Sequence, residues 1–126
     1  MIDFAPTDGQ NEIVAAVTKF CARRLPPQEV RRRDAEKIPP YDLLPEMAAL
    51  GLFRLAAPAE YGGLAEPWTT IALVQEELGR RAYLVASIFN RIVGFGVQSL
   101  LVYGSPTQRR ELLPKLLDGR ALWRSR

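Results

Sequence analysis

Apolar residues recur along the first part of the chain at intervals of three and four. This spacing predicts an amphipathic helix that begins at Thr7 or Asp8, either of which can cap it, and that runs to about Leu25. The two prolines that follow end the helix. The apolar positions that define its buried face are Ile13, Val14, Val17, Phe20 and Cys21.

The next segments are shorter, and prolines and glycines separate them. The polar run QEVRRRDAEKI predicts a surface helix or a loop whose charges pair, and Pro39-Pro40 interrupts the chain after it. Residues 41–50 predict a short helix that Gly51 ends. We expect the sequence LFRLAAP, residues 52–58, to be extended and to lead into the loop PAEYGGLAEP.

Helical spacing resumes near Pro67, a residue that suits the first turn of a helix. We expect this helix to end near Gly79 and to turn Glu76 and Glu77 away from its apolar face. That face consists of Ile71, Val74 and Leu78.

Residues 83–103 predict the longest helix, which is apolar nearly all round, as a central buried helix would be. Gly94 and Gly96 each weaken it by about 1 kcal/mol relative to alanine, so close packing or a ligand is a reason for their presence. Ser105 caps a last helix that Gly119 ends and that carries an apolar leucine face. Without strand alternation or repeats, the pattern predicts an all-α fold of five or six helices. The leucines are Leu112, Leu113, Leu116 and Leu117.

Composition excludes several function classes. Hydrophobic residues make up 48% of the 126 residues, which suffices for a packed core. Seventeen basic and fourteen acidic residues are interleaved, so the net charge of +3 forms no basic stripe for nucleic acid. The chain has no histidine, which excludes Ser-His-Asp and Cys-His catalysis and most zinc sites.

The single cysteine indicates where in the cell the protein works, and the polar residues in the longest helix indicate whether it crosses a membrane. Cys21 has no internal disulfide partner, and a buried, reduced thiol at this position leads us to expect a cytoplasmic protein. Residues 83–103 are interrupted by Asn90, Arg91 and Gln98, which argues against a membrane span.

Local motifs do not identify a reactive site. The GFG at 94–96 lacks the preceding strand and the third glycine of a dinucleotide loop. Glu76 and Glu77 diverge by about 100° on a helix, so they do not form a catalytic or metal-binding pair. Arg91 leaves two interpretations open. Its stem can pack while its head reaches water, or its charge can line a ligand cavity and pair with a carboxylate from elsewhere.

Three motifs occur in a fixed order, and the pattern to which they belong covers about residues 1–120 and leaves 121–126 as a tail that departs from it. They are EMAALGLFRLAAPAEYGGL, VQEELGRRA and YGSPTQRRELLPKLLDGRALW. Together they resemble the N-terminal helical domain of the acyl-CoA dehydrogenase family. That family typically has Pro-Glu-Glu-Tyr-Gly-Gly in the first motif, where this chain has Ala59 at the first acidic position.

The resemblance implies a flavoprotein that oxidises an acyl-CoA thioester. In the family a carboxylate removes the α-proton, FAD accepts the β-hydride, and an electron-transfer flavoprotein then takes the electrons. A β-domain and a C-terminal helical domain hold the flavin and supply the base. Because the chain stops before both, we expect a truncated chain that by itself has no catalytic residue, binds no FAD and is inactive.

The resemblance also implies that the N-terminal domain forms one wall of the acyl cavity. The residues that it places there lie on the longest helix, where Phe95 would shorten the cavity and Arg91 would make its end polar, so we expect a short or polar acyl group. The alternative is a stand-alone helical interaction module that docks on a partner chain. On either hypothesis we expect exposed apolar surface, and therefore self-association or a second subunit. The implied cavity residues are Ser87, Arg91, Ile92 and Phe95.

Overall fold

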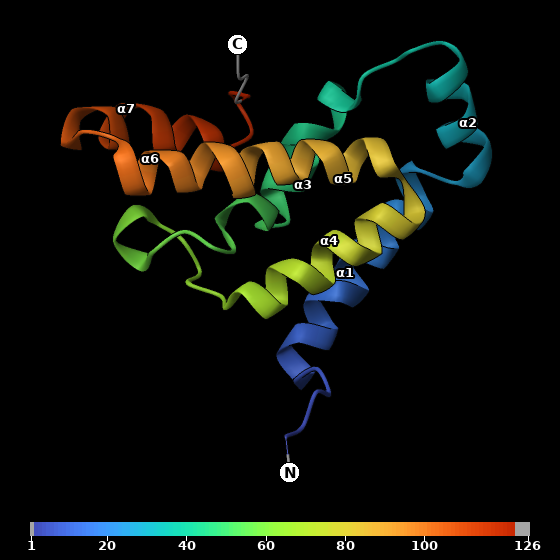
Figure 1. Ribbon diagram of the computed structural model, residues 1–126. Coiled ribbons are helices and arrows are strands. Elements are labelled where there is room, and N and C mark those ends of the chain that lie inside the picture. Colours follow the sequence, from blue (N-terminus) through green and yellow to red (C-terminus); the bar gives the residue numbers. More distant parts are fainter. Residues whose placement is uncertain (1, 123–126) are drawn as a thin grey trace.

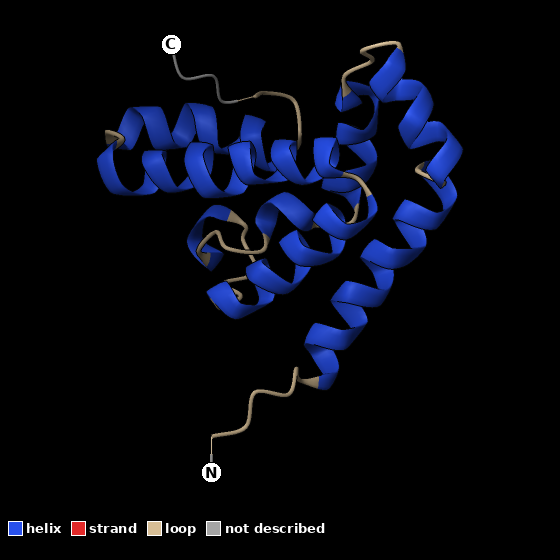
Figure 2. Cartoon of the chain, turned by 45° about the vertical axis from the view of Figure 1, so that its right-hand side comes forward, coloured by secondary structure: helices blue, strands red, loops and turns tan. Residues whose placement is uncertain are grey.

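The computed structural model describes residues 2–122, and all regular structure in that range is helical (Figure 2). A π-helical segment, η4 (Arg91–Val97), joins α5 to α6, so that Tyr83–Tyr103 is one continuous helix. The predicted all-α fold is confirmed. The α-helices are α1 (Asp8–Arg24), α2 (Pro27–Ala35), α3 (Leu44–Ala49), α4 (Trp68–Arg81), α5 (Tyr83–Asn90), α6 (Gln98–Tyr103) and α7 (Pro106–Leu117), and the 3₁₀ helices are η1 (Pro40–Leu43), η2 (Leu52–Arg54) and η3 (Ala59–Tyr61).

Thr7, one of the two predicted caps of the first helix, and Ser105, the predicted cap of the last, are the observed caps, and each forms a capping box. At the start of α1, the Thr7 hydroxyl accepts a hydrogen bond from the Gln10 amide at 3.2 Å, and the Gln10 side chain accepts one from the Thr7 amide at 2.9 Å. Ser105 and Gln108 make the same pair of bonds at the start of α7. Each box satisfies two amide groups that the helix itself leaves without partners.

The helices form two groups that meet at the core (Figure 1). α4 packs against α1 on one side and against α5 on the other, while α7 runs back along α6 and η4. The side-chain amide of Gln10 donates to Thr70 Oγ1 at 3.0 Å near the start of both helices, and the Thr18 hydroxyl donates to Glu77 at 2.9 Å further along both, so α1 and α4 run parallel. The continuous helix 83–103 contacts α4 through α5 and α7 through η4 and α6, and so connects the α1–α4 pair to α7.

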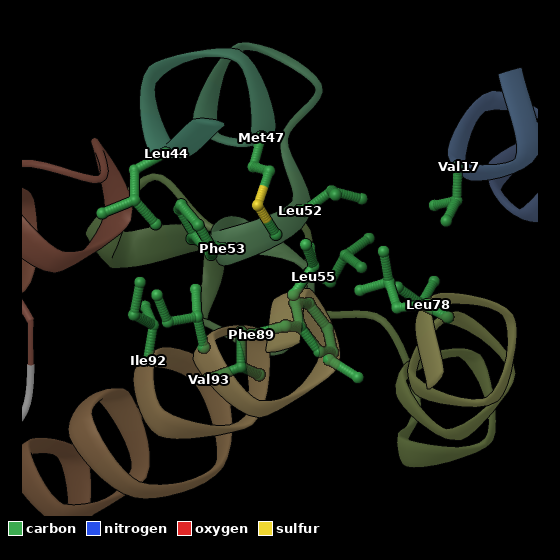
Figure 3. Close-up of a cluster of buried hydrophobic side chains, with 14 of the residues drawn as sticks. Val17, Leu44, Met47, Leu52, Phe53, Leu55, Leu78, Phe89, Ile92 and Val93 are labelled. Carbon is green, nitrogen blue, oxygen red and sulfur yellow. The ribbon is translucent and has the colours of Figure 1, made fainter. Parts of the chain in front are cut away.

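The core joins the long helix to the short elements before α4 (Figure 3). Phe53 of η2 and Phe89 of α5 are fully buried, together with Met47 of α3 and Leu78 of α4. Each such side chain stabilises the fold by about 2–3 kcal/mol through its removal from water. The 3₁₀ helices η1 and η2, which bury Leu43 and Phe53, are therefore part of the core and not merely connections.

The segment LFRLAAP is not extended, so that prediction was wrong. Leu52–Arg54 form the 3₁₀ helix η2, and turns follow it. Neighbouring residues of a strand point to opposite faces, but Leu52 and Phe53 are adjacent and only 2% and 0% exposed. A tight turn buries both side chains in the same core, whereas a strand would bury only one.

The PAEYGGLAEP loop folds back on this turn. The Leu64 amide donates to the Arg54 carbonyl at 2.9 Å, and the Glu66 amide donates to the Leu55 carbonyl at 2.7 Å. The Arg54 guanidinium donates to the Gly62 carbonyl at 3.1 Å and also pairs with Asp118, at the end of α7. The loop is thus held by its own backbone and by one arginine that links it to α7.

The two glycines of the loop have different roles. Gly62 has a φ of 78°, the left-handed conformation that other residues adopt at a cost. At Gly63 the constraint is space, because a Cβ there would stand 1.9 Å from the Ala57 carbonyl oxygen. The glycine pair therefore sets both the direction of the turn and its close approach to the preceding segment.

The polar segment after Pro26 is a helix, α2, and one of its arginines is buried. Arg33 is 6% exposed and donates to both carboxylate oxygens of Asp42, at 2.8 and 2.7 Å, and to Glu29 at 2.8 Å. The hydrogen bond from Arg33 lowers the pKa of Asp42, and hydrogen bonds led by that from Arg32 lower the pKa of Glu29 to about 2. Arg33 thereby ties α2 to η1.

Glu77 is buried, although we expected it to face away from the apolar side of α4. It is 2% exposed and accepts hydrogen bonds from Thr18 and from Arg81, both at 2.9 Å, and from Arg80. Burial alone would raise the pKa of Glu77, but the hydrogen bonds from Arg80, Thr18 and Arg81 outweigh it, and the pKa falls below its ordinary value. α4 ends at Arg81 and so includes both arginines, whereas we predicted its end near Gly79.

We expect Gly63→Ala to lower the free energy of unfolding by about 1–3 kcal/mol, because the methyl group overlaps the Ala57 carbonyl and the loop must move. Urea unfolding followed by circular dichroism measures this. Gly9→Ala is the matched control, since beyond its chain neighbours and the backbone of its own helix nothing lies within 4 Å of its Cβ position. If the two variants are equally stable, the proposed packing constraint at Gly63 is wrong.

We expect Glu77→Ala to destabilise the chain by about 1–3 kcal/mol, because Thr18 and two arginines lose a charged acceptor. Glu76→Ala is the control, since Glu76 is exposed on the same helix, and its effect should stay within about 0.5 kcal/mol.

The contribution of Glu77 should also depend on pH. Its folded pKa lies below the ordinary value of 4.5. Its stabilising effect is therefore present above that value and is lost as the pH falls through the folded pKa. The difference in unfolding free energy between wild type and Glu77→Ala should narrow on acidification. A difference that is constant with pH would show that the carboxylate charge is not what Thr18 and the arginines stabilise.

Candidate functional site

The continuous helix 83–103 is buried on one side only, which corrects the prediction of a central buried helix. Half of its most apolar window, whose mean hydropathy is 1.5, is buried within the domain. By length and composition alone the helix could cross a membrane, a test that core helices of water-soluble proteins also pass. Its other side, which we call the outer face, is half-buried or exposed. The outer face consists of Ser87, Asn90, Arg91, Gly94, Phe95, Gln98 and Val102.

Three of the four predicted cavity residues share the outer face. Ser87 is half-buried, Arg91 is exposed, and Phe95 is 56% exposed. Ile92 differs, because it is 0% exposed and lies within the core with Phe89 and Val93 (Figure 3). The structure therefore brings Ser87, Arg91 and Phe95 together and separates Ile92 from them.

The outer face coincides with the π-helical segment. In η4 the backbone hydrogen bonds run from i to i+5, a geometry that often marks functional positions in helices. Gly94 lies in this segment, and a Cβ there would stand 2.5 Å from Oδ1 of Asn90. Gly94 thus leaves room for the Asn90 side chain. The sequence did not lead us to assign Asn90 to the site, although a glycine four residues after it on a helix indicates that the two lie side by side.

Arg91 is the only charged residue of the continuous helix. Of the twelve arginines in residues 2–122, ten hydrogen-bond or pair with another described group. Within the same residues, Arg31 and Arg91 have no such partner. Arg31 lies on the polar helix α2, where a charge is ordinary, whereas Arg91 projects from the most apolar helix of the chain.

A separate cleft of about 530 Å³ lies where α1, α2 and α4 meet, with Cys21, Pro26 and Arg80 among its lining residues. The predicted burial of Cys21 is confirmed at 1% exposure. Burial raises the pKa of this thiol to about 11, so it is protonated at neutral pH and a poor nucleophile. Within residues 2–122, no group of three or more acidic, histidine or cysteine side chains is arranged to hold a metal ion.

Comparison with known sequences places these features in a family. The sequence model described as acyl-CoA dehydrogenase, N-terminal domain, matches residues 7–120. The chain is 31% identical over 111 residues to the very long-chain specific acyl-CoA dehydrogenase of Mus musculus and 31% identical over 125 residues to the 2-methylacyl-CoA dehydrogenase of Solanum tuberosum. These matches cover 88% and 89% of this chain but only 16% and 27% of the two relatives.

Solved structures show the same fold over almost the whole chain. A chain in the structure of the electron transferring flavoprotein of Acidaminococcus fermentans superimposes with a TM-score of 0.86 and 23% identity, over 96% of this chain and 32% of that one. The FAD complex of PigA gives a TM-score of 0.82, likewise at 23% identity over 96% of this chain and 32% of that one. Together with the family match over residues 7–120, these findings show that the chain belongs to the acyl-CoA dehydrogenase family and corresponds to its N-terminal domain.

Proposed function

We propose that this chain forms one wall of the acyl cavity of a flavin-dependent acyl-CoA dehydrogenase. The observation that carries the proposal is the outer face of the continuous helix. It exposes Phe95 and Val102, which are 56% and 63% exposed, beside the polar side chains of Asn90 and Arg91. An apolar surface with a few convergent polar groups is the usual lining of a small-molecule site.

The role of the wall is to bind and orient the acyl group and to exclude water. Burial of an acyl chain against Phe95 and Val102 contributes about 25 cal/mol for each Å² of apolar surface removed from water. Exclusion of water also strengthens electrostatic interactions at the reacting carbons. The core beneath the face, including Ile92, keeps the helix in place while the outer side chains contact the ligand.

FAD, when bound, would accept the hydride from the β-carbon of the acyl group. We assign no residue of this chain to FAD and none to the catalytic base. In the proposal both come from the parts of the relatives that lie beyond the matched region, since the chain spans only 16% and 27% of the two described above.

A helical docking module is the second candidate function. The same exposed apolar side chains on the outer face would suit a protein partner, because large uncovered apolar patches mark interfaces. The two functions differ in what the complex binds once a partner covers the outer face. In an acyl-CoA dehydrogenase the assembled complex binds flavin and a thioester, whereas a docking module needs neither.

The flavin spectrum tests the proposed function. We expect the purified chain to show no flavin absorbance, and we expect a yellow complex once a second polypeptide supplies the remaining domains of an acyl-CoA dehydrogenase. Addition of an acyl-CoA should then bleach the flavin band. Stable binding of the second polypeptide without flavin would favour the docking module, and bound flavin in the chain alone would contradict our assignment of FAD to other domains.

The exposed outer face should also make the isolated chain self-associate. We expect sedimentation to show dimers or larger species that dissociate in Phe95→Ser, because that change removes a large exposed apolar side chain from the face. Phe4→Ser is the matched control, since Phe4 is 89% exposed but lies on the segment before α1. A wild-type chain that stays monomeric at high concentration would argue against this expectation.

A further inference from the structure

We infer that Arg91 receives a carboxylate at the far end of the acyl group, so that the substrate class is the CoA thioester of a short dicarboxylic acid. The inference rests on the proposed function, because it assigns a specificity-determining residue within the same cavity wall.

The charge of Arg91 has no counterpart on its own helix. Residues 83–103 contain no acidic side chain, and no acidic group within residues 2–122 pairs with Arg91. The one arginine that is buried within residues 2–122, Arg33, pairs with Asp42 and Glu29. If the outer face is covered, Arg91 loses water and then requires an anion, because a buried charge without a partner is strongly unfavourable.

The neighbours of Arg91 favour a carboxylate as that anion. Ser87, four residues before it, lies on the same face, and Asn90, directly before it, is exposed about 100° further round the helix. A guanidinium donates two parallel hydrogen bonds to a carboxylate, and neighbouring hydroxyl and amide groups can donate to its remaining lone pairs. The Asn90 side chain lies over Gly94, where a Cβ would stand 2.5 Å from its Oδ1.

Phe95 limits the length of the acyl group. It lies four residues beyond Arg91 on the same face and is 56% exposed. An aromatic ring at this position takes up space that a long acyl chain would need. A short acyl group that ends in a carboxylate satisfies both residues, since it is charged where Arg91 lies and stops before the ring.

The test compares two thioesters that differ only at the far end of the acyl group. Glutaryl-CoA ends in a carboxylate, and pentanoyl-CoA has the same number of acyl carbons but ends in a methyl group. The isotope-labelled chain, in complex with the second polypeptide that supplies the remaining domains, is titrated and followed by NMR, through the Nε–H signal of Arg91 and the amides of Ser87 and Phe95. We expect glutaryl-CoA to bind more than about 5-fold more tightly, above the range for an exposed ion pair, because the covered face shields the pair from water.

The variants separate Arg91 from general charge effects. Arg91→Gln should remove the preference for glutaryl-CoA, and Arg91→Lys should retain part of it, because lysine keeps the charge but not the paired hydrogen bonds. Arg31→Gln is the matched control, since it removes the other arginine without a described partner, on α2, and should leave the preference unchanged. Arg91 is exposed, so these changes leave the core intact.

The outcomes distinguish this inference from the proposed function. If both thioesters shift the outer-face signals with equal affinity, or if Arg31→Gln removes the preference as well, Arg91 does not select a carboxylate, although the cavity wall stands. If neither thioester shifts the outer-face signals, the wall and the inference both fail. A preference that is present in wild type, lost in Arg91→Gln and kept in Arg31→Gln would support the inference.

Discussion

The one-sided burial of the continuous helix 83–103 is the constraint on which the rest of the structure depends. Phe89 and Ile92 on its inner side close the core with Phe53, and α4 and α7 pack against the same helix. Because the inner side is committed to this core, the opposite side must face outward. The apolar residues there are not needed for the fold of the described domain, and this is why their exposure is informative.

The short elements around the helix are held by arginine–carboxylate contacts between segments that are distant in sequence. Arg54 links the glycine loop to Asp118 after α7, and Arg24 pairs with Glu46 of α3 at 2.6 Å. The contacts of Arg54 and Arg24 orient segments of three to six residues that are too short to be stable helices alone. Glu77 differs, because its carboxylate is buried and its two arginines lie at the surface of the same helix, α4.

The family relation and the geometry of the outer face support each other. The family match concerns residues 7–120 and by itself says nothing about which side of the helix is used. The structure shows which side is exposed, since Ser87, Arg91 and Phe95 lie outward while Ile92 is in the core. The proposed role of Arg91 depends on this exposure, because its charge requires a partner once that face is covered.

The sequence by itself determined the longer helices, the cap at Ser105 and the family. Thr7 and Ser105 cap their helices through contacts within three residues, and apolar spacing along a helix is a local property. Ordered motifs are likewise read along the chain. None of these features depends on which distant segments pack together.

Only the tertiary structure decided which polar residues are buried and how the irregular segments run. Glu77 faces inward because Thr18 of α1 lies beside it, and residues 52–57 turn because adjacent side chains enter one core. The side of the long helix that remains exposed depends in the same way on where α4 and α7 pack. These outcomes arise from contacts between residues far apart in sequence, which spacing along the chain does not specify.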